Sequence, residues 1–259
     1  MKQKYFFFDI DGTLTDGSDF YGGIPDSAVT AIRRLKENGH QVAIATGRPY
    51  EKAKPMAELV GIDCMVCNGG YACYEQDICL ESRGLDKKDC LHVIQECRAV
   101  HIPFCVSCDD TFAFYSHEEG FLEAVQPCIF RGTLKILPNL NYTKIPEIHR
   151  ILIALKPGEE TMIRDYHSLV PMRYHETYVV VEPDDKFHGI ETMMRHWRGN
   201  LQDVVVFGDG LNDVKMFQQA AFSIAMGNAV EKLKQEADYV TACAEEDGIR
   251  EALYHFGWI

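Results

Sequence analysis

The chain of 259 residues lacks any apolar run long enough to cross a lipid bilayer. Its longest purely apolar stretches have the length of a strand, as in Tyr5–Phe8 and Val204–Phe207, whereas a membrane helix needs about 20 apolar residues. A secretory signal is also missing, because Asp9 follows a short apolar run and such a signal needs about 7–15 apolar residues. We therefore expect a cytoplasmic protein with no membrane partner.

Positive charge is scarce in this sequence. Lys and Arg number 26 against 39 Asp and Glu, so the formal net charge is −13. A chain with this excess of acid repels a polyanion, which argues against nucleic acid as a partner. The hydrophobic share of 46% is enough for packed cores and excludes a disordered chain. The length fits one large domain or two modest ones.

Neither a disulfide framework nor a zinc site is indicated, although the chain has ten cysteines. Reduced thiols are expected in a chain that can build its own hydrophobic core. The pairs Cys64/Cys67 and Cys105/Cys108 have a C-x-x-C spacing, but both lie in strand-like apolar runs without a histidine at zinc-finger spacing. The cysteines are therefore predicted to be structural.

Strand-like and helix-like segments alternate at both ends of the chain. Alternating units of this length form a parallel sheet with helices on both faces, so the predicted fold class is α/β, with a doubly wound, Rossmann-like parallel-sheet core made of residues 1–81 and 183–259. Asn68-Gly69-Gly70 predicts a hairpin turn, and Pro55 predicts a kink or early stop in the helix that follows Pro49. The predicted core strands are 4–8, 41–45, 64–67, 71–74, 204–207, 222–225 and 239–241, and the other predicted core helices are 27–37, 189–197, 212–220 and 229–236.

The segment between these ends has a different pattern of helix-like and strand-like stretches. Residues 82–182 mix helix-like and strand-like stretches without regular alternation, which predicts an inserted α+β lid domain. Its predicted helices are 87–100 and 159–168, and its predicted strands are 103–107, 111–115, 133–137, 150–155 and 177–182.

Polar clusters follow three of the predicted core strands. They are Asp9–Thr13, Thr46–Arg48 and Gly208–Asp213. In an open α/β sheet, ligands bind beyond the carboxyl ends of the strands near the switch point, so these distant segments can converge on one crevice. Carboxylates from the first and third clusters would then lie close together.

We expect these carboxylates to bind a divalent cation. They are Asp9, Asp11, Asp209 and Asp213. Like charges at such short range do not all stay ionised without a cation. Mg²⁺ prefers oxygen ligands and commonly adds a substrate phosphate oxygen, whereas zinc favours softer donors. The sequence therefore predicts Mg²⁺ as the cofactor.

We expect this site to bind a phosphoryl group. Thr46, the Gly47 amide, Lys186 and Asn212 can hold phosphate oxygens, and Gly12 lets the backbone turn so that its amides approach an anion. One carboxylate could attack phosphorus to give an aspartyl-phosphate, while another protonates the leaving oxygen and then activates water.

These motifs resemble a known family. Phe7–Leu14, Ala45–Pro49, Lys186 and Gly208–Asp213 are similar to the four motifs of the haloacid-dehalogenase-like (HAD) phosphatases. A second set of segments narrows the resemblance to the Cof-type subfamily, whose large lid is inserted between the second and third motifs. These segments are Asn68-Gly69-Gly70, Ala225–Ala229, Asp247–Ile249 and His255-Phe256-Gly257.

The resemblance implies a role for each matching residue. Asp9 would be the nucleophile and Asp11 the general acid and base. Thr46 and Lys186 would hold the phosphate. The implied Mg²⁺ ligands are Asp9, the Asp11 carbonyl and Asp209, with Asn212 and Asp213 in support. The sequence departs from the family at Phe187, where a glycine often follows the lysine, and the small residue comes only at Gly189.

Other residues near the motifs allow two interpretations each. Arg48 and Asn68 are candidates for the mouth of the site, although Arg48 could instead be a solvated charge at a helix start. Asp16 and Asp19 could form a second metal cluster or part of a polar loop.

The tyrosines after the hairpin turn are also ambiguous. One of Tyr71 and Tyr74 could face the crevice, or both could pack in the core. Lys215 is expected at the surface of its helix.

The predicted function is that of a Mg²⁺-dependent phosphomonoesterase. The resemblance implies small phosphorylated metabolites as substrates, such as sugar phosphates or phosphorylated cofactors, hydrolysed through an aspartyl-phosphate. One alternative is a sugar phosphomutase that passes the same phosphoryl group to a second hydroxyl. Another is a non-catalytic regulator that binds a phosphometabolite on the same fold.

Overall fold

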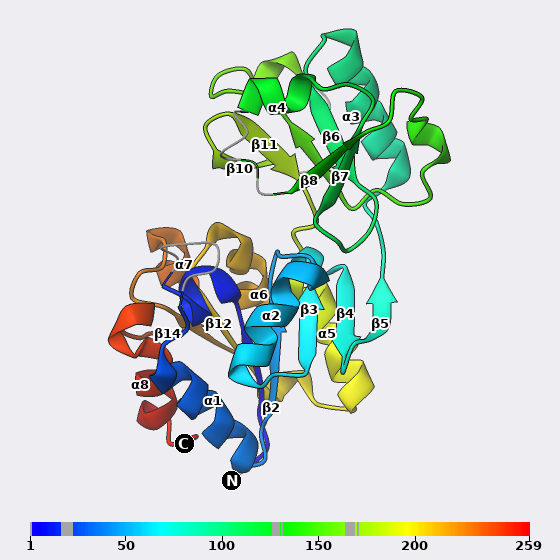
Figure 1. The fold of residues 1–259 in the computed structure, drawn as a ribbon. Helices are drawn as coiled ribbons and strands as arrows, with labels where there is room; N and C mark the ends of the chain where they lie inside the picture. Colours follow the sequence, from blue (N-terminus) through cyan, green and yellow to red (C-terminus); the bar gives the residue numbers. More distant parts are fainter. Residues whose placement is uncertain (1, 17–22, 126–129, 131, 164–168, 170) are drawn as a thin grey trace. The chain divides into compact units, whose positions relative to one another are not determined.

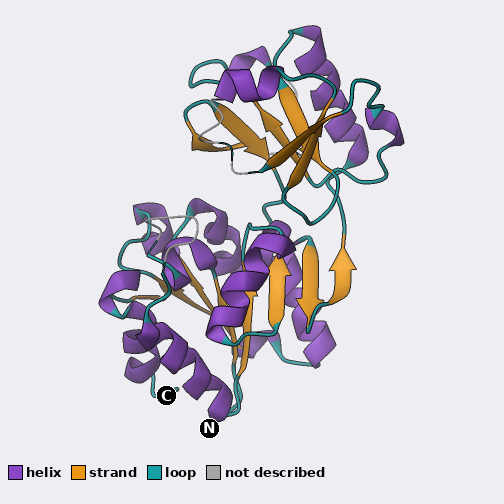
Figure 2. Cartoon of the chain, viewed as in Figure 1, coloured by secondary structure: helices purple, strands orange, loops and turns teal. Residues whose placement is uncertain are grey.

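The chain divides into two compact units. The computed structural model describes residues 2–16, 23–125, 130, 132–163, 169 and 171–259 (Figures 1 and 2). The core unit comprises Met1–Ser82 and Asp184–Ile259, and the inserted unit comprises Arg83–Pro183. The division predicted from the sequence lies at 81/82 and 182/183.

An eight-stranded sheet forms the centre of the core unit. From β14 to β3 neighbouring strands are parallel, and β3, β4 and β5 form an antiparallel edge. The strand order is β14 (Tyr239–Val240), β13 (Phe222–Ala225), β12 (Val204–Gly208), β1 (Tyr5–Phe8), β2 (Gln41–Ala45), β3 (Cys64–Cys67), β4 (Ala72–Glu75) and β5 (Ile78–Ser82). The chain thus winds from β1 to β3 in one direction and from β12 to β14 in the other, which puts the switch point at β1 and β12.

Helices cover both faces of this sheet (Figure 1). Because successive strand residues point to opposite faces, Phe6 and Phe8 join one hydrophobic core and Phe7 joins the other. The first core is completed by α1 (Asp26–Glu37), α2 (Tyr50–Val60) and α8 (Gly248–His255). The second is completed by α5 (Lys186–Trp197), α6 (Val214–Gln219) and α7 (Glu231–Glu236). The predicted α/β class with a doubly wound core is confirmed.

Several predicted elements differ from the structure. Helix α2 continues past Pro55 to Val60, so the predicted early stop is wrong; Pro55 is exposed, where water can solvate the affected backbone. Helix α5 begins at Lys186, three residues earlier than predicted. Strand β5 and helix α8 were not predicted at all.

The inserted unit has a sheet of its own (Figure 2). Helices α3 (Lys87–Ala99) and α4 (Gly120–Val125) accompany it, and its apolar core includes Phe114, Phe121 and Leu152. The strand order is β10 (Pro171–His175), β11 (Tyr178–Val181), β9 (Arg150–Ile153), β6 (Phe104–Ser107), β7 (Ala113–Ser116) and β8 (Thr133–Ile136). Strands β7 and β8 pair in parallel, and the other neighbouring pairs of these strands are antiparallel.

The predicted helix over 159–168 is not found in the described part of the unit. A short 3₁₀ turn at Glu160–Met162 occupies its first half, and residues 164–168 lie outside the described residues. Strand β10 and helix α4 were not predicted.

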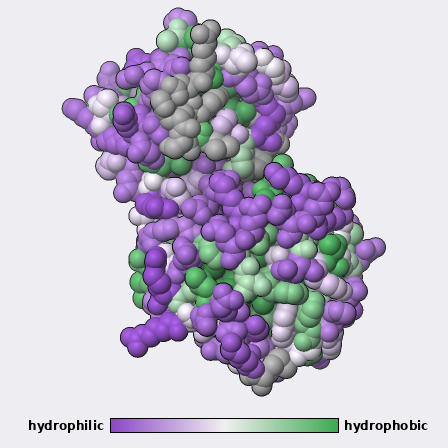
Figure 3. All heavy atoms as spheres, turned by 180° about the vertical axis from the view of Figure 1, so that it is seen from behind, coloured by the Kyte–Doolittle hydropathy of each residue, from purple (hydrophilic) through white to green (hydrophobic). Residues whose placement is uncertain are grey.

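Hydrophilic and hydrophobic residues are unevenly distributed over the face drawn in Figure 3. In the view of Figure 3, hydrophilic residues cover much of both units, and hydrophobic residues gather near the middle of the core unit. None of the helices described is long and apolar enough to cross a membrane.

The cysteines within the described ranges are free thiols. Burial raises the pKa of Cys64, Cys90 and Cys97 to about 12, so these thiols stay protonated at neutral pH. No cysteine among the described residues belongs to a cluster of metal-binding side chains.

A buried histidine makes the stability of the core unit depend on pH. His40 packs edge-on against Phe6, and its Nδ1 accepts a hydrogen bond from the Lys4 N–H at 3.0 Å. Burial lowers the pKa of His40 from its usual 6.5, so below that pH the unfolded chain binds a proton that the folded chain resists. We expect the contribution of His40 to the free energy of unfolding to fall as the pH drops below about 6.5, against the opposite contribution of the raised pKa of Asp9 and Asp209.

Replacing this ring tests the prediction. His40→Asn keeps an acceptor for Lys4 but cannot titrate, so lowering the pH from 7 to 5 should shift its melting temperature upward relative to that of the wild type. The melting temperature of this variant should still depend on pH, because burial also lowers the pKa of His149. The exposed His101→Asn is the control. Identical pH profiles for His40→Asn and the wild type would contradict the assignment.

Candidate active site

The polar clusters meet at the carboxyl edge of the core sheet. Asp9 directly follows β1, and its N–H donates to the Phe207 carbonyl of β12 at 3.1 Å. Asp209 directly follows β12, and Thr46 directly follows β2 on the other side of β1. Since β1 lies between β12 and β2, residues about 200 positions apart in sequence reach one site.

Lys186 lies at the centre of this site. Its ammonium donates to Oδ1 of Asp9 at 2.7 Å and to Oδ1 of Asp213 at 2.6 Å, and its side chain is 1% exposed. Burial disfavours the charged ammonium, but the carboxylates of Asp213 and Asp9 outweigh it and raise the pKa of Lys186. The lysine is therefore a fixed positive charge between two buried acids.

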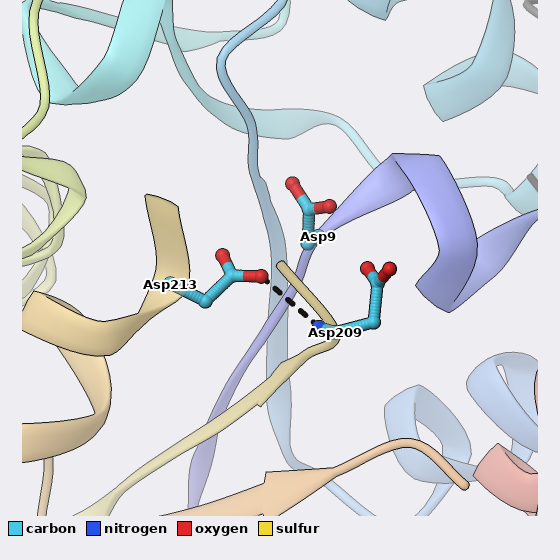
Figure 4. Close-up of side chains that lie close together, drawn as sticks. All are labelled: Asp9, Asp209 and Asp213. Atoms are coloured by element: carbon cyan, nitrogen blue, oxygen red, sulfur yellow. Dashed lines mark hydrogen bonds between the residues drawn. The ribbon is translucent and has the colours of Figure 1, made fainter. Parts of the chain in front are cut away.

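Asp213 organises the loop that follows β12. Its Oδ2 accepts the N–H of Asp209 at 3.0 Å (Figure 4) and the N–H of Gly210 at 3.0 Å. Its Oδ1 accepts from Lys186. Both carboxylate oxygens are thus engaged by donors from the protein. This arrangement holds Asp209 in place and points Asp213 toward Lys186.

Three carboxylates lie close enough to share a cation (Figure 4). One oxygen each from Asp9, Asp209 and Asp213 lies within 4.8 Å of the others. Burial, with the neighbouring acids, raises the pKa of Asp9 well above its usual value and that of Asp209 to about 7. These oxygens, with no sulfur or nitrogen ligand among them, fit a hard cation such as Mg²⁺.

Gly12 turns the chain back over this acidic cluster. Its φ is +77°, and an added Cβ would lie 2.2 Å from Oδ2 of Asp209. The Gly12 carbonyl accepts a hydrogen bond from Nδ2 of Asn228 at 2.8 Å, and Oδ1 of Asn228 accepts from the Ala244 N–H at 3.0 Å. Asn228 was not among the predicted site residues, although it lies in the motif Ala225–Ala229.

A side chain at position 12 should damage both fold and site. Gly12→Ala is expected to lower the free energy of unfolding by about 1–3 kcal/mol, because it adds strain at positive φ and displaces Asp209. Urea unfolding and phosphate-release rates measure the two effects. Gly23→Ala is the matched control, since a Cβ there meets no atom of the described residues within 4 Å. Wild-type stability for Gly12→Ala would contradict the close approach.

The residues predicted to hold phosphate have different surroundings. Thr46 is fully buried, and its Oγ1 accepts the Arg48 N–H at 3.1 Å. Gly47 and Asn212 are half-buried, with Asn212 beside Gly210. Their contacts with a phosphate remain predictions.

Arg48 is not the solvated charge that one interpretation of the sequence allowed. Its side chain is 3% exposed, and its guanidinium donates to both carboxylate oxygens of Asp11, from Nε at 2.9 Å and from Nη2 at 2.5 Å. The sequence did not indicate this pair, because 37 residues separate its members.

The other ambiguous residues near the site are now placed. Asn68 is buried with φ +54°, and its N–H donates to the Arg48 carbonyl at 2.8 Å. A role for Arg48 and Asn68 at the mouth of the site remains a prediction. Asp19 lies outside the described residues, and Asp16 belongs to no metal-binding cluster among those described.

The two tyrosines have separate environments. Tyr74 is buried and stacks on Tyr50, with ring centroids 4.0 Å apart, so it packs in the core. Tyr71 is half-buried and precedes β4. Lys215 is half-exposed, as expected, and pairs with Asp184.

Phe187 does not enter the site. It is 6% exposed and packs in the second hydrophobic core with Ile190 and Met193. The close approach falls instead at Gly189, where an added Cβ would lie 2.2 Å from Cγ1 of Val66. The departure from the family pattern therefore leaves the ammonium of Lys186 unaffected.

The family can now be assigned. A family model described as haloacid dehalogenase-like hydrolase matches residues 6–253, nearly the whole chain. The chain belongs to this family. The resemblance seen in the motifs is thereby confirmed, and the chain is a HAD-like hydrolase.

Relatives of this HAD-like hydrolase include named phosphatases. One relative is the Bacillus subtilis (strain 168) protein named Putative phosphatase YkrA. It is 30% identical over 264 residues, and the match covers 99% of each chain. In the same organism, the 5-amino-6-(5-phospho-D-ribitylamino)uracil phosphatase YitU is 27% identical, over 96% of this chain and 95% of its own. A solved structure of a HAD subclass IIB sugar phosphatase, BT4131, superimposes with a TM-score of 0.78 at 26% identity, covering 99% of this chain and 100% of that one.

Proposed function

We propose that this HAD-like hydrolase is a Mg²⁺-dependent phosphomonoesterase that acts through an aspartyl-phosphate on Asp9. The observation that supports it most is the buried ammonium of Lys186 between Asp9 and Asp213, with Asp209 completing the cluster. A positive charge beside a carboxylate cluster suits a phosphoryl group, which is anionic and develops charge on its oxygens during transfer.

Asp9 and Asp209 are the side chains that would hold Mg²⁺, with the Asp11 carbonyl. Asp213 would not bind the metal directly, because hydrogen bonds already engage both of its oxygens. It would instead hold Asp209 and Lys186 in position. Asp209 is oriented by the Thr13 hydroxyl, which donates to its Oδ1 at 3.1 Å. When bound, Mg²⁺ would neutralise the carboxylates and polarise the phosphoryl group.

Asp9 would attack phosphorus in the first step. Lys186 holds Oδ1 of Asp9, which orients the carboxylate for attack through its other oxygen. The new O–P bond forms as the bond from phosphorus to the leaving oxygen breaks, and Asp11 gives that oxygen a proton. In the second step Asp11 takes a proton from water, the water oxygen attacks phosphorus, and phosphate leaves with Asp9 restored.

The phosphate oxygens would be held by groups around this centre. Thr46, the Gly47 amide, Lys186 and Asn212 would bind them, and the turn at Gly12 would bring its backbone amides near. These are neutral or positive donors, so they balance the charge that the acids of the site add.

Small phosphorylated metabolites are the proposed substrates. YitU and BT4131 are named for a phosphorylated ribitylaminouracil and for sugars, respectively. The phosphorylated ribitylaminouracil and a sugar phosphate are both phosphomonoesters of small hydroxyl compounds. We propose this class of substrate for the present hydrolase.

A substrate panel tests the proposal. Sugar phosphates, nucleotides and phosphorylated cofactors are incubated with the full chain, with Mg²⁺ or with a chelator, and released phosphate is measured. Release that requires Mg²⁺ is expected. Full activity with the chelator would contradict the metal. Isomerisation of a sugar phosphate without release would indicate a mutase, and binding without either reaction would indicate a regulator.

A further inference from the structure

The carboxylate of Asp11 depends on Arg48 for its position. The Asp11 side chain is 50% exposed, so water alone would leave it several rotamers. Arg48 receives it with two parallel N–H···O bonds of 2.9 and 2.5 Å, one to each oxygen. A planar guanidinium fork fixes both the place and the plane of a carboxylate, which a single hydrogen bond does not.

Arg48 itself is held from several sides. Its side chain is 3% exposed, its N–H donates to Oγ1 of Thr46, and its carbonyl accepts the Asn68 N–H at 2.8 Å. The turn at Asn68 is tied in turn, because the Gly69 N–H donates to the Thr46 carbonyl at 3.1 Å. The loops after β2 and β3 therefore fix the backbone of Arg48, and the burial of its side chain restricts where the guanidinium can lie when it receives the half-exposed acid.

We infer that Arg48 is the positioning residue of Asp11, the proposed general acid and base. This inference rests on the proposed function. The two hydrogen bonds occupy one lone-pair direction on each oxygen of Asp11, and the remaining directions stay available to a leaving group or a water. Arg48 thus acts through Asp11 and makes no contact with the reacting phosphorus or the leaving oxygen.

A direct contact between Arg48 and the substrate phosphate is the competing role. The two roles differ in how the loss of Arg48 depends on the leaving group. A p-nitrophenolate leaves without a proton, whereas the alkoxide of a sugar phosphate needs one from Asp11. Loss of positioning should therefore penalise the sugar phosphate alone, while loss of a phosphate contact should penalise both substrates.

The test compares kcat/KM, which reports the first phosphoryl transfer, for p-nitrophenyl phosphate and for the best sugar phosphate of the panel. Arg48→Met is expected to lower kcat/KM about 100-fold for the sugar phosphate and less than about threefold for the aryl ester. Arg48→Lys, which keeps the charge but not the fork, should fall between Arg48→Met and the wild type. Arg250→Met, a surface arginine paired with Asp247, is the control and should change neither value.

A double-mutant cycle adds a second readout. In the Asp11→Asn background, Arg48→Met should cause no further loss of kcat/KM for the sugar phosphate, because the group that it positions is already disabled. Additive losses, or equal losses for both substrates, would overturn the inference and leave the proposed function standing. A wild-type chain that releases phosphate from neither substrate would overturn both. Retained aryl activity shows that the Arg48 variant is folded.

Discussion

Asp9→Asn is expected to abolish phosphate release while the chain stays folded. The amide has nearly the shape of the carboxylate but is a very poor nucleophile, and loss of a nucleophile costs roughly 10⁴- to 10⁶-fold in kcat. Lys186 keeps a partner in this variant, because Asp213 accepts from it at 2.6 Å. The fold should tolerate the change, since Asp9 is a buried acid whose pKa is raised by burial and by its acidic neighbours.

Phosphate release and thermal melting, measured on the same preparation, check this prediction. Asp26→Asn makes the same chemical change on the exposed first turn of α1 and should retain full activity. More than a few per cent of wild-type activity in Asp9→Asn would remove Asp9 from the role of nucleophile. A melting temperature far below that of the wild type would mean that Asp9 also supports the fold.

Lys186→Met is expected to have the largest effect on stability. Methionine is of similar length but leaves the buried carboxylates of Asp9 and Asp213 without their cation. Removing one partner from a buried ion pair costs about 3–5 kcal/mol. Activity should also be lost, because the proposed phosphate contact disappears.

The pH dependence of this variant distinguishes the loss of the Lys186 charge from the loss of its side-chain packing. Burial raises the pKa of Asp9, and removing Lys186 takes away the charge that opposes this rise, so the free energy of unfolding should recover as the pH falls from 7 toward 5. Lys234→Met, which removes a surface lysine paired with Glu231, should melt with the wild type. Wild-type stability of Lys186→Met at pH 7 would show that the cation is not needed there.

The core of the fold was predictable from sequence because its elements carry strong local patterns. The continuous apolar runs of β1 and β12 predict central strands, and the polar clusters after them follow from the rule for open α/β sheets. The edge strand β5 was missed, since its largely exposed residues do not alternate clearly. Strand β10 was missed because it begins with a proline and lies at a sheet edge.

The site was predictable to the level of residue types but not of contacts. The sequence places Asp9, Lys186 and Asp213 in motifs, yet only the fold shows that the lysine lies between the two acids. The pair formed by the buried Arg48 and the half-exposed Asp11 joins loops 37 residues apart, and no local pattern predicts such a contact. A charged residue before a helix can be solvated or can face the site, so the sequence left both environments open for Arg48, and the fold shows it buried.

Attack by the Asp9 carboxylate is the central step of the proposed reaction, and peptide mapping of the trapped intermediate tests it most directly. The full chain is mixed with Mg²⁺ and a hydrolysable phosphomonoester, quenched in acid within milliseconds and digested with pepsin, and the site of phosphorylation is located by mass spectrometry. We predict a phosphoryl group on Asp9 in the wild type and none in Asp9→Asn. Rapid turnover with no phosphorylated peptide, or a phosphoryl group on another residue, would contradict the account.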